Sequence, residues 1–200
     1  DYRVYPDFKT NEEMEQLMEK EHQERIYRYE EYVQKHQPSE VVKKYIGELL
    51  KADYYTAWFD NLLRARNYQV EGVDIHRYTD KLTEATSLLE NQVITDAHFR
   101  MSQEMYSYLH AINERLQAND HNVTLEDVLS PLKDTPAMPY LYTLALSSSL
   151  YQQNDTTYFD SQRENFDRYI QSPYLRNSIL QIHQSKKGFQ ENPKPVSDYI

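Results

Sequence analysis

Glu19 and His22, in the segment MEKEHQER, are the two residues whose types and spacing best fit a metal site. A Glu-x-x-His pair places a carboxylate and an imidazole on one face of a helix, as di-iron bundle proteins require. Such a site also needs a second Glu-x-x-His pair on another helix, and the sequence contains none. The pair lies in the most charged part of the chain, so we interpret it as a solvated helix face.

The other histidines do not suggest a zinc site. They lack His-x-x-x-His and His-Glu-x-x-His spacing, which would place two ligands on one helix face. These scattered residues are His36, His76, His98, His110, His121 and His183. We therefore expect no metal and no metal cofactor.

Two further groups could carry catalysis. Asp53 and Asp60 flank Trp58 and could be the paired carboxylates of a glycosidase. Their spacing on a helix is explained more simply by one polar stripe. Ser147, Ser148 and Ser149 lack the Gly-x-Ser-x-Gly pattern of a nucleophile elbow, and small serines in an apolar helix usually permit close helix packing. We therefore expect no catalytic residues and no enzyme activity in this segment.

The composition limits the classes of partner that the chain could bind. The 200-residue chain has a net charge of −10, which disfavours nucleic acid and anionic membranes because phosphate binding needs a basic surface. It has no Cys, which excludes a disulfide framework and a thiol nucleophile. No run of about 18 apolar residues occurs, so we expect no membrane insertion by this segment. The sequence opens at Asp1 and carries no signal peptide, as a processed product would.

The sequence predicts an all-α fold, because three Gly leave few positions for tight β-hairpins. Residues 1–10 form an extended lead-in, 11–188 a helical domain and 189–200 a linker-like tail. The domain is expected to be an irregular multi-helix bundle of about seven or eight helices, and a superhelical arrangement is also allowed. A break is expected at 91–95 and a proline-rich connector at 131–139. The expected helices cover about 11–36, 40–66, 80–90, 96–117, 125–132, 139–151, 157–171 and 173–187.

Capping residues set the helix boundaries. Thr10 and Glu13 have capping-box spacing, and Ser39 follows Pro38 as the N-cap of a second helix. The first two helices should therefore form an antiparallel hairpin. Thr124 with Asp127 should start a short helix, and Gly188 should stop the last one.

The segment from Ser39 to Arg66 should be the hub of the fold. At 100° per residue its apolar face changes sides near Ala52, which predicts packing against one neighbour before this residue and another after it. Leu49→Asp and Trp58→Asp should then both unfold the domain.

Nineteen tyrosines suggest a second way to read the chain. Tyrosine is common at protein interfaces because its ring is apolar and its hydroxyl is polar. A freestanding helical adaptor could bind a peptide or partner protein through a Tyr-lined groove, and it would show an open concave face with exposed tyrosines. Two glycosylation sequons, at Asn122 and Asn154, matter only in a eukaryotic secretory setting.

One long segment resembles a known family. YEEYVQKHQPSEVVKKYIGELLKADYYTAWFDNLL is similar to the helical region that precedes the thioredoxin-like domain in bacterial extracytoplasmic, lipoprotein-type thiol–disulfide oxidoreductases. YIQSPYLRNSILQIHQ and NPKPVSDYI resemble the run-in to such a domain, and the likeness covers about half the chain.

The resemblance implies a non-catalytic function. The family's active residues are a Cys-x-x-Cys pair, and this chain has no Cys, so no catalytic role transfers to any position. The chain would be a non-catalytic accessory domain in the periplasm or cell envelope, for protein interaction or domain positioning. Its partner would be a client protein or a neighbouring domain of the same chain, with the redox domain beyond Ile200 or absent.

Overall fold

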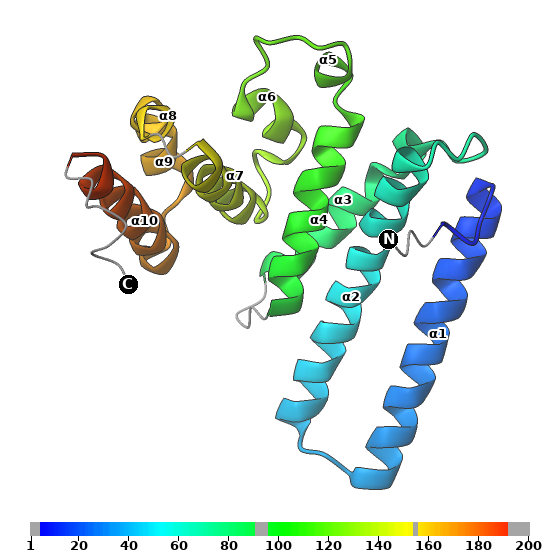
Figure 1. Cartoon of the computed structure of the whole chain (residues 1–200). Helices are drawn as coiled ribbons and strands as arrows, with labels where there is room; N and C mark the ends of the chain where they lie inside the picture. The colour runs from blue at the N-terminus through cyan, green and yellow to red at the C-terminus, as the bar shows by residue number, and fades with distance from the viewer. Residues whose placement is uncertain (1–4, 91–95, 154–155, 192–200) are drawn as a thin grey trace, which may run out of the picture. The chain divides into compact units, whose positions relative to one another are not determined.

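The computed structural model describes residues 5–90, 96–153 and 156–191, and in these ranges the protein is all-α, as predicted (Figure 1). No strand occurs in the described part of the chain, where an isolated bridge between Thr10 and Gly72 is the only β pairing. The expected break at 91–95 lies outside the described residues.

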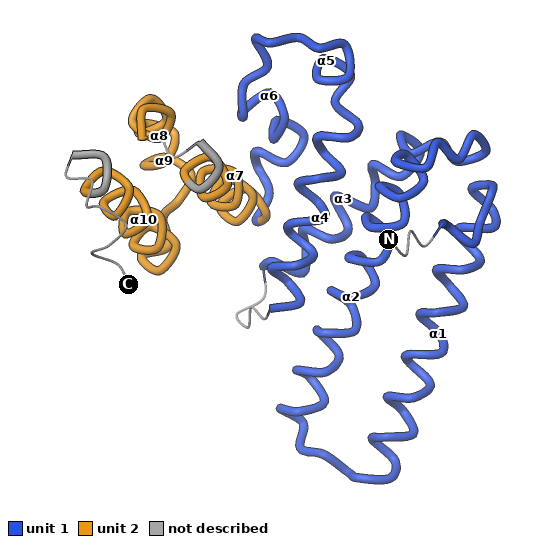
Figure 2. The backbone as a smooth tube through the Cα atoms, viewed as in Figure 1, with its two compact units in different colours: residues 1–136 blue, residues 137–200 orange. Residues whose placement is uncertain are grey.

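The chain divides into two compact units, Asp1–Pro136 and Ala137–Ile200 (Figure 2). The division falls within the proline-rich segment that the sequence identified as a connector. The division of the chain into a lead-in, a helical domain and a tail stays a prediction.

Unit 1 is built on an antiparallel hairpin of α1 (Asn11–His36) and α2 (Glu40–Asn67). Both helices begin where the capping residues predicted. The Thr10 side chain accepts a hydrogen bond from the Glu13 amide, and the Ser39 side chain accepts one from the Val42 amide. The Glu13 carboxylate accepts from the amide of Lys9, one residue before the N-cap, at 2.7 Å.

Four further elements of unit 1 lie around α2. They are η1 (Ile75–Tyr78), α3 (Asp80–Thr86), η2 (Ser87–Glu90) and α4 (Asp96–Ile112). Figure 1 shows α2 between α1 and α4, and α2 also contacts α3, η1 and η2. α2 is therefore the shared neighbour of both long helices, as its two apolar faces predicted.

The two halves of α2 are buried to different degrees. After Ala52 the helix buries Trp58, Phe59 and Leu62, and the Phe59 ring lies 5.4 Å from that of Tyr108 on α4. Before Ala52, Val41 is 78% exposed and Tyr45 is 46% exposed. The start of α2 has α1 as its neighbour, where the Tyr29 hydroxyl donates to the Lys43 carbonyl at 3.1 Å. Its other sides stay open because the hairpin extends beyond α4 there (Figure 1).

The lead-in is fixed to unit 1 by Phe8 and by the loop after α2. Phe8 is 2% exposed. The Asn11 amide donates to the Gly72 carbonyl at 3.1 Å, and the Asp74 amide donates to Asn11 Oδ1 at 3.1 Å. A Cβ on Gly72 would collide with the backbone carbonyl of Lys9, so only glycine fits this close approach.

The helix expected over 96–117 ends earlier, at Ile112. Asn113 leaves the helical conformation at ψ 104°, and its side chain accepts from the Leu116 amide to start α5 (Glu114–Gln117). α6 (Leu125–Leu129) then begins at Thr124 with the predicted capping box, and η3 (Ser130–Leu132) follows. The cap formed by the Asn113 side chain therefore interrupts a helix that the hydrophobic periodicity alone predicted to be continuous.

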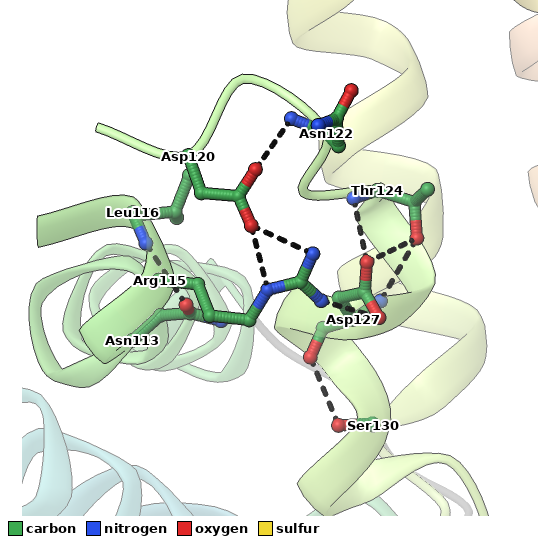
Figure 3. A network of polar contacts seen from close by, with 8 residues as sticks. All are labelled: Asn113, Arg115, Leu116, Asp120, Asn122, Thr124, Asp127 and Ser130. Atoms are coloured by element: carbon green, nitrogen blue, oxygen red, sulfur yellow. Dashed lines mark hydrogen bonds and ion pairs between the residues drawn. The ribbon is translucent and has the colours of Figure 1, made fainter. Parts of the chain in front are cut away.

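One arginine ties the loop between α5 and α6 together (Figure 3). The Arg115 guanidinium lies 2.8 Å from Asp120 Oδ2 and 3.3 Å from Asp127 Oδ1. Backbone and side-chain hydrogen bonds from Thr124 lower the pKa of Asp127, and the amide of Asn122 lowers that of Asp120; Arg115 lowers both. The guanidinium occupies the space between the two carboxylates, so the cluster has its own counter-charge.

Unit 2 packs α7 (Met138–Gln153) against three helices: α8 (Thr157–Ser161), α9 (Arg163–Tyr169) and α10 (Pro173–Glu191). Two sequence expectations were wrong here. The helix expected over 157–171 is interrupted at Gln162, where ψ is 9°. Gly188 does not stop α10, which continues to Glu191. Nothing lies within 4 Å of the position that a Cβ on Gly188 would take.

Candidate functional site

Glu19 and His22 lie on α1, but the structure does not assemble a metal site around them. Glu19 Oε1 accepts a hydrogen bond from Gln23 Nε2 at 2.8 Å. The His22 ring lies against Tyr54 of α2, with centroids 4.2 Å apart. Among the described residues, no group of three or more His, Asp or Glu is arranged to hold a metal ion.

The other residues that the sequence suggested for a site also lie apart from one another or are partly buried. His98 is buried, whereas His36, His76 and His121 are exposed at separate places in unit 1. Ser147, Ser148 and Ser149 are half-buried on α7, the helix that packs against α10. Of the two sequons, Asn122 is exposed in the loop before α6 and Asn154 lies outside the described residues.

Asp53 and Asp60 do share a surface feature, although each has a basic partner. Asp53 Oδ1 lies 3.4 Å from a guanidinium nitrogen of Arg100, and Asp60 Oδ2 lies 3.9 Å from one of Arg64. Both aspartates line a groove of about 620 Å³ together with Glu104. Burial and the nearby Asp60 raise the pKa of Glu104. Three carboxylates thus lie along this groove, which Arg25 and Arg100 also line.

A second, smaller groove of about 290 Å³ lies closer to the hairpin turn and has a different chemistry. Almost all of its surface is apolar or aromatic. It is lined by Arg25, Arg28, Tyr29, Tyr32, Ile46 and Leu50. Two of these lining residues are basic and none is acidic.

The two grooves are continuous, because Arg25 and Leu50 line both of them. We call the whole feature the α2 groove, the part lined by Tyr29, Tyr32, Ile46 and Leu50 its tyrosine end, and the part lined by Asp60 and Glu104 its acidic end. α2 forms the floor throughout, and α1 and α4 contribute the walls.

The floor of the α2 groove is one stripe along α2. Its residues are spaced alternately four and three apart, and they are Ile46, Leu50, Asp53, Ala57 and Asp60. A stripe with this period is the seam along which two helices pack at a small crossing angle. Ile46, Leu50, Asp53 and Ala57 are half-buried and Asp60 is exposed, so α1 and α4 leave this stripe partly accessible to solvent.

Large apolar side chains around the tyrosine end are exposed as well. Tyr32 is 40% exposed, and Tyr27, Val41, Val42 and Tyr45 on the same hairpin are also exposed. Sequence reasoning noted the Tyr content and the start of α2, but it missed Arg25 and Arg28. The four-three spacing was the signal that could have identified the stripe.

Within the described ranges, no helix is both long enough and apolar enough to cross a bilayer. Comparison with known proteins finds no matching family model, no matching curated protein and no matching solved structure.

Proposed function

We propose that this chain is a non-catalytic protein-interaction domain whose α2 groove binds an amphipathic helix of a partner protein. The observation that carries the proposal is the open stripe from Ile46 to Asp60. Its residues lie in one line along α2 between α1 and α4, so a partner helix aligned with α2 would contact all of them.

The chemistry of the tyrosine end supports binding through burial of apolar surface. Tyr29 and Tyr32 offer large rings at a low cost in side-chain entropy, and Ile46 and Leu50 offer aliphatic surface beside them. Ala57, further along the stripe, is small enough to let a second helix approach closely. An apolar stripe on the partner would therefore be covered where it lies over Ile46, Leu50 and Ala57.

The accessory role in an extracytoplasmic thioredoxin-like protein, which the resemblance implies, is compatible with this proposal. In that setting the bound helix would belong to a client protein or to a neighbouring domain. The parent protein, its cellular compartment and the identity of the partner stay predictions. The α2 groove is a surface on which the proposal can be tested directly.

The test is the binding of a designed amphipathic helix with a leucine stripe, measured by fluorescence anisotropy and mapped by amide chemical shifts. Binding should shift the resonances of Tyr32, Ile46, Leu50 and Ala57. Leu50→Arg should abolish binding while circular dichroism shows an unchanged fold. Val41→Arg, on the same helix but outside the groove, is the matched control and should bind normally.

Tyr32→Ala provides a second test if Leu50→Arg impairs folding, because Tyr32 is already part-exposed. No binding by the unmodified chain, or equal binding by all variants, would refute the groove as the site. A dimer in sedimentation experiments that Leu50→Arg dissociates would assign the groove to a second copy of this chain and overturn the partner assignment.

A further inference from the structure

We infer that the helix held in the α2 groove is charge-segregated, with carboxylates in the half over Arg25 and Arg28 and with Lys or Arg in the half over Asp60 and Glu104. This inference rests on the proposed function and adds the chemistry of the partner. Three features of the groove support it.

The first feature is the weakly paired positive charge at the tyrosine end. Arg28 has no hydrogen bond or ion pair with another residue of the described part of the chain. Arg25 lies 4.0 Å from Glu21, at the outer limit for an ion pair. Because two arginines and no acidic residue line this end, a carboxylate at the edge of the partner helix would find basic groups to pair with.

The second feature is the uncompensated negative charge at the acidic end. Within the described ranges, Glu104 has no hydrogen bond or ion pair with a basic side chain. Asp60 is held by Arg64 only loosely, at 3.9 Å. An ammonium or guanidinium group of the partner would relieve the repulsion between these two carboxylates.

The third feature is the balance between the two ends. Asp53 on the floor and Arg100 on the α4 wall form an ion pair, so the middle needs no charge from the partner. The stripe from Ile46 to Asp60 is about 21 Å long at 1.5 Å per residue. A partner helix of about 15 residues therefore reaches both charged ends with its apolar stripe over the middle.

Three designed peptides separate this inference from the proposed function. All carry the same leucine stripe. One has its Glu and Lys residues segregated into opposite halves, one has the same residues interspersed, and one has them all replaced by Gln. We expect the segregated peptide to bind the unmodified chain about fivefold more tightly than the interspersed one, with an advantage that shrinks as salt screens the charges.

Charge reversals on the chain complete the test. Arg28→Glu and Glu104→Lys should each remove the advantage of the segregated peptide and leave binding of the Gln peptide unchanged. Lys20→Glu makes the same charge change as Arg28→Glu at an exposed α1 position outside the groove, and it should keep the advantage.

The outcomes are distinguishable. Equal affinity for the segregated and interspersed peptides overturns the charge inference and leaves the groove proposal standing. Failure of all three peptides, including the uncharged one, overturns the proposed function and the inference with it.

Discussion

The imidazole of His22 on α1 lies against the phenol ring of Tyr54 on α2, with ring centroids 4.2 Å apart. Burial lowers the pKa of His22; the nearby Glu19 raises it, and Arg25 lowers it. A protonated imidazole would place a charge in the packed interface of the hairpin. Stability of the hairpin is therefore coupled to the protonation of this histidine.

Acidification should weaken the fold. Burial also lowers the pKa of His98 and His110, so at slightly acidic pH the unfolded chain binds more protons than the folded one. The stabilisation is complete above the ordinary histidine value of about 6.5 and is lost as the pH falls from there toward the folded pKa values. Thermal unfolding measured between pH 8 and pH 5, roughly the range in which histidine titrates, should show a falling midpoint.

Single variants show which histidine causes the pH dependence of the unfolding midpoint. His22→Gln should make the midpoint less dependent on pH, because one of the three groups no longer titrates. His121→Gln, at an exposed position in the loop before α6, serves as the control and should leave the slope unchanged. An identical slope in His22→Gln and the unmodified chain would show that this ring does not contribute.

The two glycines of unit 1 should respond oppositely to alanine. Gly72→Ala should cost about 1–3 kcal/mol of unfolding free energy, because the new Cβ meets the Lys9 carbonyl and pushes the lead-in from the loop. Gly47→Ala should add about 0.5–1 kcal/mol, because Gly47 lies within α2 and nothing surrounds the added methyl. Urea unfolding followed by circular dichroism measures both. A stabilising Gly72→Ala would contradict the close approach.

Trp58→Asp should unfold unit 1. The indole is 4% exposed and lies 5.1 Å from the Tyr78 ring, so the substitution would remove this aromatic packing and place a charge in the core. Leu49 is only half-buried, so Leu49→Asp should cost about 1–2 kcal/mol and leave a folded chain. The sequence predicted loss of folding for both, and far-UV circular dichroism with urea titration distinguishes the two views.

Arg115→Met should loosen the loop between α5 and α6 without changing the rest of unit 1. Without the guanidinium, the pKa values of Asp120 and Asp127 should rise toward the usual aspartate range. Carboxyl titration by NMR measures the rise, and amide hydrogen exchange over residues 119–124 should become faster. Arg100→Met, which breaks the surface pair with Asp53, is the control. Unchanged exchange would mean that the Thr124 capping box alone holds the loop.

Local chemistry explains which helix boundaries the sequence predicted. Thr10, Ser39 and Thr124 cap their helices as expected, because an N-cap is decided by a side chain and the amides two or three residues later. The interruptions at Asn113 and Gln162 were missed, because apolar periodicity continues across both. Gly188 was misassigned as a stop, since a glycine ends a helix only where the chain turns away.

The α2 groove lies beyond what a single sequence can predict. The face switch at Ala52 predicted that α2 has two neighbours, and the burial of Trp58 agrees. It could not show that α1 and α4 leave the stripe from Ile46 to Asp60 uncovered, because that depends on the positions of three helices. Arg28 and Glu104 belong to the site only through those positions.

The projecting end of the α1–α2 hairpin has a consequence for how this chain can vary through evolution. Toward the turn the two helices have only each other as neighbours (Figure 1), and the turn between them is capped by Ser39 and by Gln37 in the left-handed conformation. Paired insertions or deletions of about seven residues, two helical turns, would preserve the seam and leave the core around Trp58 untouched. Homologous chains are therefore expected to differ in arm length by whole heptads, while the distance from Ala52 to Asn67 stays constant.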